Sequence, residues 1–183
     1  MPKIVEELLF DGAPNLIDRL GLEELLAEVR TLICGFELLI LEERDSNGAG
    51  ALRKLIDERF TSAQGWVQRK TGGVDWSKRQ AINGRPRFIS LGVEIQVSGR
   101  SDLIAVDLIH LRQQLLQGDI DLAVLVVPSD RLGTFLTDRV AKKSEAMRHI
   151  QWLKCEDMPF VLMVIEHDGI GPALAKMVYK SKT

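Results

Sequence analysis

The chain has 183 residues with a formal net charge of −2, and 45% of its residues are hydrophobic and 27% charged, which is typical of a globular protein. No run of about 18 uncharged apolar residues occurs, so we expect no membrane span. Its two cysteines form no metal-type pair, and the acidic N-terminal stretch is unlike a secretory signal, so we expect a cytoplasmic location.

The N-terminal part, to about residue 60, is predicted to be helical. Apolar residues recur at helical spacing within the first 31 residues, and a further stripe at Leu52, Leu55 and Ile56 ends near Phe60. Residues 36–42 fit either a helix or a strand, and residues 45–50 have the composition of a loop. Residues 1–50 carry 4 basic and 11 acidic side chains, so this part is acidic.

From about residue 70 to 170 the pattern is that of an α/β core. A short strand at residues 74–76 is followed by the hairpin signal Asn83-Gly84 and by a segment of β-formers at 88–97. An amphipathic helix then carries Ile104, Leu108, Leu111 and Leu115 and ends at Gly118.

Two continuous apolar runs complete this core, at residues 122–127 and 160–165, with a helical stretch around 132–148 between them. Such runs are typical of strands that are buried on both faces. We therefore expect one α/β domain over residues 1–183, with a mixed central sheet flanked by helices.

Candidate catalytic residues lie on the strand at 88–97. Side chains alternate along a strand, so Glu94 and Gln96 share one face while Val93, Ile95 and Val97 share the other. A carboxylate and an amide are costly to bury without partners. This pattern fits a cation site that phosphate can reach, but by itself it favours an amphipathic strand with its polar face in water.

Asp75 strengthens the first interpretation. Pairing across Asn83-Gly84 would bring Asp75 beside the strand that carries Glu94, and two carboxylates with open water positions suit Mg²⁺. Residues 51–100 also carry 10 basic and 4 acidic side chains, which indicates a local site for a polyanion or a surface on which charges happen to segregate.

A longer stretch of the sequence resembles a known family, the BglII/BstYI-like type II restriction endonucleases of the PD-(D/E)XK superfamily. The resemblance spans residues 74–169, over half of the chain, and rests on these segments: Val74–Trp76, Gly92–Asp102, Asp107–Arg112, Gly118–Asp121, Val127–Leu132, Thr137–Arg139 and Ile165–Gly169. This branch has Gln where most of the superfamily has Lys, which agrees with Gln96.

The resemblance implies a restriction-endonuclease-like fold, Mg²⁺-dependent cleavage of double-stranded DNA at a palindrome that contains GATC, and a homodimer. It implies Asp75 and Glu94 as metal ligands, Gln96 as the third catalytic residue, and Ser98 as a residue that faces DNA. Candidate contacts to bases or phosphates are Arg100, Ser129, Arg131 and Arg139. The acidic N-terminal part is a candidate for the dimer interface.

Several alternatives stay open. Glu58 could approach the site as an extra carboxylate, or be a solvated charge on its helix. Residues 166–168 follow a buried strand and could be a second metal or DNA contact, or a loop bracketed by Gly169 and Gly171. Other functions that fit are a repair or structure-specific nuclease of the same superfamily, a DNA-binding protein that has lost cleavage, and a nucleotide-binding regulator.

Overall fold

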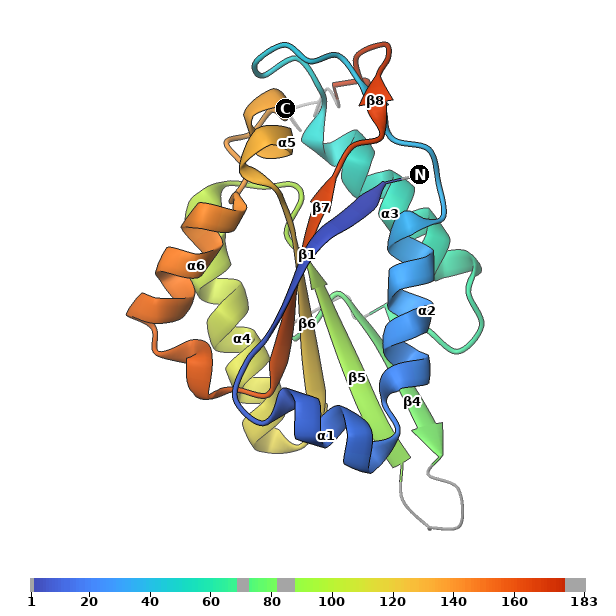
Figure 1. The fold of residues 1–183 in the computed structure, drawn as a ribbon, viewed down its shortest axis with the longest axis vertical. Helices are drawn as coiled ribbons and strands as arrows, with labels where there is room; N and C mark the ends of the chain where they lie inside the picture. The colour runs from blue at the N-terminus through green and yellow to red at the C-terminus, as the bar shows by residue number, and fades with distance from the viewer. Residues whose placement is uncertain (1, 69–72, 82–87, 177–183) are drawn as a thin grey trace, which may run out of the picture.

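The computed structural model describes residues 2–68, 73–81 and 88–176, in which helices cover both faces of a central sheet (Figure 1). The sheet order is β1-β7-β6-β5-β4-β3. Its strands are β1 (Lys3–Leu9), β3 (Val67–Gln68), β4 (Trp76–Ala81), β5 (Phe88–Ile95), β6 (Leu122–Pro128) and β7 (Phe160–Glu166). A small parallel pair joins β2 (Leu39–Ile40) to β8 (Gly169–Ile170).

The helices form two layers. On one face lie α2 (Glu23–Cys34) and α3 (Ala49–Ser62), and on the other lie α4 (Ile104–Gln117) and α6 (Lys143–Trp152), as Figure 1 shows. The remaining helical elements are α1 (Ala13–Leu20), α5 (Asp130–Phe135) and the 3-10 turns η1 (Ser101–Leu103) and η2 (Cys155–Asp157). This three-layer arrangement confirms the predicted α/β fold with a mixed sheet flanked by helices.

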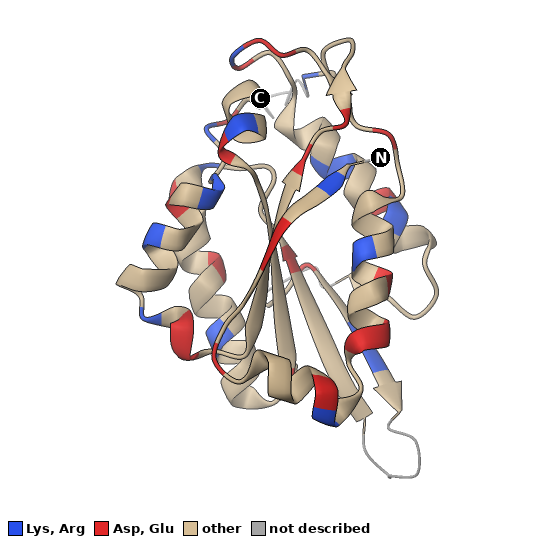
Figure 2. Ribbon diagram, in the orientation of Figure 1, with Lys and Arg blue, Asp and Glu red and all other residues tan. Residues whose placement is uncertain are grey.

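The centre of the sheet is parallel and almost wholly apolar. Strands β5, β6 and β7 run in parallel, so their carboxyl ends lie at one edge of the sheet. All seven residues of β6 are buried, because apolar side chains from both helical layers pack on its two faces. Figure 2 shows that these central strands carry few charged residues. A charged side chain on them therefore needs a specific explanation.

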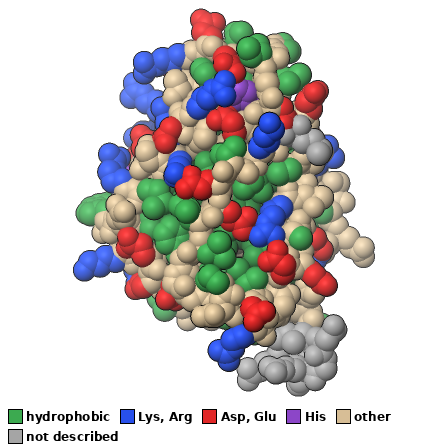
Figure 3. Space-filling model, viewed as in Figure 1, with side chains coloured by type: hydrophobic (Ala, Val, Ile, Leu, Met, Phe, Trp, Pro, Cys, Tyr) green, Lys and Arg blue, Asp and Glu red, His purple; other side chains and the backbone are tan. Residues whose placement is uncertain are grey.

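The prediction of helices from the first residue is wrong for Lys3–Leu9. These residues form β1, which pairs antiparallel with β7 and places Ile4 opposite Ile165 and Leu8 opposite Leu162. Pairing with a distant strand overrides a local composition that favours a helix. Figure 3 shows apolar side chains gathered around β1 in the middle of this face. Val5 and Leu9 of this strand are exposed.

The predicted elements of the core are mostly confirmed. Strand β4 pairs antiparallel with β5, as hairpin pairing requires, although Asn83-Gly84 itself lies outside the described residues. Asp75 immediately precedes β4 rather than lying within it. The stretch predicted as helical around 132–148 is two helices, α5 and α6, separated by Asp138 and Arg139, whose φ angles are positive. None of the helices in the described part of the chain is long and apolar enough to span a membrane.

Candidate active site

Asp75 and Glu94 lie side by side at the carboxyl end of β5. The β4–β5 register pairs Trp76 with Val93, which sets the preceding residue, Asp75, beside Glu94. The backbone N–H of Asp75 donates to Glu94 Oε2 (3.2 Å), and the N–H of Ile95 donates to Asp75 Oδ2 (2.8 Å). The structure thus brings together the two carboxylates in the way that the hairpin argument predicts.

The face of β5 that carries Glu94 is polar and buried. Glu94 is 8% exposed and Gln96 5% exposed, whereas Val93, Ile95 and Val97 pack into the apolar core on the α2–α3 side. The amide nitrogen Nε2 of Gln96 is buried without a hydrogen-bond partner among the described residues. An unpartnered buried donor is costly, and such groups are typical of sites that bind something.

A third carboxylate, Asp107 of α4, faces the same place and was missed by the sequence analysis. Its Oδ2 atom is buried without a hydrogen-bond partner among the described residues. Burial, and then the negative charge of Asp75, raises the pKa of Asp107 to about 6. The sequence offered one signal for this role, namely that Asp107 directly precedes Leu108, a residue of the apolar stripe of its helix.

These charges act on Glu94 in turn. Burial first, and then the charges of Asp75 and Asp107, raise the pKa of the Glu94 carboxyl well above its usual range. A strongly shifted carboxyl group that is held by a specific neighbour is typical of functional sites. This upward shift in pKa favours the protonated form of Glu94, and a bound cation would favour the charged form.

Helix α3 contributes a basic and an acidic residue. Arg53 forms an ion pair with Asp75 Oδ1 (2.7 Å), donates to the carbonyl of Ile95 (2.9 Å) and pairs with Asp57 (2.9 Å). Asp57 also accepts from Trp76 Nε1 (2.9 Å). Neither Arg53 nor Asp57 was singled out in the sequence, although their i, i+4 spacing puts both on one side of a helix.

Glu58 is placed differently from the site carboxylates. Its side chain is 60% exposed and pairs with Lys54 (3.8 Å) on the same helix. The neighbouring Asp57 is the acidic residue of α3 that reaches the network around Asp75, through Arg53. Among the described basic residues of the block at 51–100, Arg53, Lys54 and Lys78 are likewise paired with acidic side chains of the protein.

The five candidate DNA contacts divide into two groups. Arg100 and Arg139 line one cleft beyond the carboxyl end of β5, and both are exposed. The Arg100 side chain makes two hydrogen bonds to Asp102, and the Ser101 N–H donates to the carbonyl of Arg139 (3.0 Å). Ser98 precedes this cleft and is half-buried. This group is open to a ligand.

The second group belongs to a polar cluster at the ends of β6 and β7. Ser129 caps α5 by accepting from the Leu132 N–H (2.9 Å) and donates to Glu166 (2.6 Å). Glu166 also pairs with the ring of the buried His167, whose other nitrogen lies 2.9 Å from Glu42. Arg131 binds Glu42 as well (2.7 Å). Residues 166–168 are thus engaged within the protein, and Gly169 begins β8.

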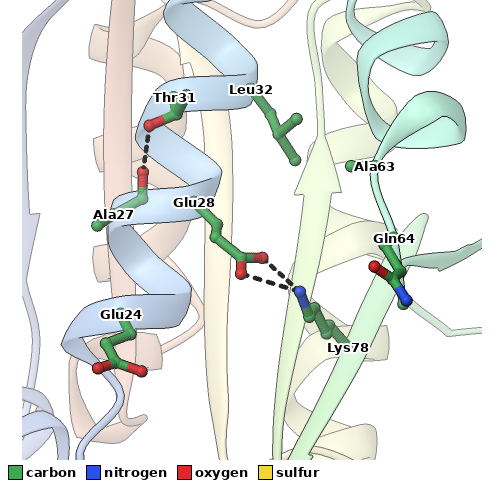
Figure 4. A pocket seen from close by; sticks show the side chains of 9 residues that line it. Glu24, Ala27, Glu28, Thr31, Leu32, Ala63, Gln64 and Lys78 are labelled. Carbon is green, nitrogen blue, oxygen red and sulfur yellow. Dashed lines mark hydrogen bonds and ion pairs between the residues drawn. The ribbon is translucent and has the colours of Figure 1, made fainter.

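A separate hollow lies between α2, the end of α3 and β4 (Figure 4). Its polar centre is Glu28, which binds Lys78 Nζ at 2.6 and 2.9 Å and accepts from Trp66 Nε1 (3.2 Å). The rest of the lining is largely small or apolar. Because its carboxylate is satisfied by two donors, this hollow offers no free chemical group comparable to those around Glu94.

The residues around Glu94 fit a divalent cation. Asp75 and Glu94 carry carboxylate oxygens, which Mg²⁺ prefers as ligands. The raised pKa of Glu94 reflects burial first and then the negative charges of Asp75 and Asp107, which a cation would offset. Among the described residues no three His, Cys, Asp or Glu side chains form a ready metal-binding group. The protein would thus supply two carboxylates, and water, backbone or DNA oxygens would fill the other positions, as is common for Mg²⁺.

Comparison with known proteins identifies the family of the chain. A family model described as restriction endonuclease BamHI matches residues 3–181, which is nearly the whole chain. The comparison with curated proteins gives no match.

Proposed function

Because the chain belongs to the BamHI restriction endonuclease family, and is therefore a type II, sequence-specific endonuclease that binds double-stranded DNA, we propose that it cuts a palindromic site with Mg²⁺ as a homodimer. Within the family we assign it to the BglII/BstYI-like branch. Asp75, Glu94 and Gln96 form the cutting site, with Asp75 and Glu94 as the metal ligands. Ser98, Arg100 and Arg139 are the proposed DNA contacts.

The observation that carries this proposal is the pair of adjacent carboxylates at the end of β5. The backbone N–H of Asp75 donates to Glu94 Oε2 (3.2 Å), and the unpartnered amide nitrogen of Gln96 lies on the same face of the strand as Glu94. In an α/β sheet, ligands bind beyond the carboxyl ends of parallel strands. The open cleft lined by Arg100 and Arg139 lies beyond the same end of β5.

The chemistry follows from the charge that builds up during phosphodiester hydrolysis. A divalent ion bound here would stabilise negative charge on the phosphoryl oxygens and lower the pKa of a bound water. Gln96 is uncharged, so its amide can donate a hydrogen bond to orient water or phosphate but cannot replace the charge of a lysine. Glu94 would give up its proton as the cation binds, because the cation offsets the charges that raise its pKa.

The homodimer is supported by apolar side chains on the outer side of η1, α4 and α6. Leu103, Val106 and Ile109 are each nearly half exposed and follow one another at three-residue spacing, and Trp152 of the neighbouring α6 is 72% exposed. A row of exposed apolar side chains along one helical segment, such as Leu103, Val106 and Ile109, is typical of a surface that another protein covers. We therefore place the interface here rather than on the acidic N-terminal part. Sedimentation equilibrium measures the molar mass and so tests whether the protein is a dimer.

The decisive experiment is to digest a plasmid of known sequence with the protein and Mg²⁺ and to sequence the fragment ends. Two identical subunits that each cut one strand give symmetric cuts at one palindrome, and the resemblance of the sequence suggests a GATC core. Ends without a common palindrome would refute the proposal and favour a repair-type nuclease. A palindrome without GATC would retain the enzyme class and show that specificity has diverged.

A further inference from the structure

Arg53 directs its guanidinium group at three oxygen atoms around the proposed cutting site. These atoms are Asp75 Oδ1 at 2.7 Å, the carbonyl oxygen of Ile95 at 2.9 Å and Asp57 Oδ2 at 2.9 Å. The Arg53 side chain is only 21% exposed. Burial alone would lower its pKa, but the charges of Asp75 and Asp57 outweigh burial and raise it, so the group is a permanent cation.

The atoms that Arg53 holds are those that a divalent ion at this site would use. Asp75 Oδ2 accepts from the Ile95 N–H, so Oδ1 is the oxygen left for a metal ion, and Arg53 pairs with that atom. The Ile95 carbonyl lies next to Glu94 in the chain and also accepts from Arg53. Carboxylate and carbonyl oxygens are the ligands that Mg²⁺ and Mn²⁺ prefer.

Two further contacts fix Arg53 in this position. Asp57 binds the guanidinium from the next turn of α3, and Asp57 is itself held by the indole N–H of Trp76. Trp76 is the first residue of β4, one position after Asp75. The guanidinium group of Arg53 is thus anchored to α3 and, through Asp57 and Trp76, to β4, which directly follows Asp75.

We propose that Arg53 competes with the divalent ion for Asp75 Oδ1 and the Ile95 carbonyl, and so sets how tightly the site binds metal. The inference rests on the proposed function, because it takes Asp75 and Glu94 as the metal ligands. Arg53 acts through Asp75 and is therefore a positioning residue. Like charges a few ångströms apart in a partly buried site repel strongly, so the effect on affinity is at least about tenfold.

The test is a titration of the full chain with Mn²⁺ in the absence of DNA, with free Mn²⁺ counted by electron paramagnetic resonance. Arg53→Gln is expected to lower the dissociation constant of Mn²⁺ by about tenfold or more. Arg53→Lys keeps the charge and is expected to bind Mn²⁺ within a few-fold of the wild type. The matched control is Arg59→Gln, which removes an exposed positive charge from the same helix and should leave affinity nearly unchanged.

The outcomes separate this inference from the proposed function. If Glu94→Gln does not weaken Mn²⁺ binding in either background, the metal site is wrong and both ideas fail. If binding depends on Glu94 but Arg53→Gln binds no more tightly than the wild type, only the competition is refuted. Should Arg53→Gln alone fail to fold, Arg53→Gln/Asp57→Asn leaves no unpaired carboxylate on α3 and must show the same gain.

Discussion

Two buried polar clusters lie at the carboxyl end of the sheet, and they differ in how their groups are satisfied. Around His167, the side chains of Ser129, Glu166 and Glu42 bind one another and the imidazole ring. Around Glu94, the carboxyl groups repel one another, and Gln96 Nε2 and Asp107 Oδ2 are buried without partners within the described residues.

The difference teaches which cluster stabilises the fold and which is arranged to bind a ligand. A satisfied buried network stabilises the structure around it, and breaking it leaves unpaired groups. An unsatisfied one costs stability, and that cost is offset when a ligand of the right charge binds. Substitutions around His167 should therefore lower stability and leave activity nearly unchanged. Substitutions around Glu94 should lower activity without lowering stability.

The largest effect is expected at Glu94. Glu94→Ala removes a proposed metal ligand, so cleavage should fall by roughly 10³-fold or more. Specific DNA binding should stay within a factor of a few, because Glu94 serves the cation rather than the DNA contacts. Single-turnover cleavage and a gel-shift titration measure the two quantities, and cleavage at the wild-type rate would remove Glu94 from the site.

A somewhat smaller loss is expected for Asp75→Asn. The amide keeps an oxygen that can accept from the Ile95 N–H but loses the charge that attracts a cation, so we expect cleavage to fall by roughly 10²-fold. The same single-turnover assay applies. An unchanged rate would mean that another carboxylate, Asp107 or Glu58, is the partner of Glu94.

In the satisfied cluster the effect should fall on stability. His167→Ala leaves Glu166 and Glu42 without their shared partner, so we expect the free energy of unfolding to drop by about 2–3 kcal/mol. Urea denaturation followed by circular dichroism measures it. The cleavage rate per folded molecule should stay within about twofold, and a loss as large as that of Glu94→Ala would abolish the distinction between the clusters.

The smallest predicted effect is a gain in the free energy of unfolding rather than a loss. In a chelating buffer, Glu94→Gln should raise the free energy of unfolding by roughly 1–2 kcal/mol at pH 8. The raised pKa of Glu94 means that the folded state holds a proton that the unfolded state releases, so this contribution to stability falls as pH rises above about 4.5. The gain should therefore vanish near pH 4, and an equal gain at both pH values would contradict the assigned cause.

The sequence predicts well what depends on local periodicity. The apolar runs predicted β6 and β7, and the stripe from Ile104 to Leu115 predicted α4. Strand alternation together with one hairpin signal was enough to place Asp75 beside Glu94. In each of these cases the spacing within a short segment already defines which side chains share a face.

What the sequence did not predict depends on contacts between distant segments. The segment Lys3–Leu9 is a strand because β7 pairs with it. Asp107 of α4 and Arg53 of α3 approach the site from helices on opposite faces of the sheet (Figure 1). No local sequence pattern determines how these helices pack on the sheet. Ser129, a candidate DNA contact, also caps α5 and binds Glu166, and the sequence did not predict these two contacts.

The pairing of β1 with β7 also bears on how the protein is made. Lys3 lies opposite Glu166, so β1 finds its partner only after all the residues between them have been synthesised. Until then, β6 lacks its neighbour β7 and β1 has no strand to pair with. Contacts so distant in sequence make folding slow and late.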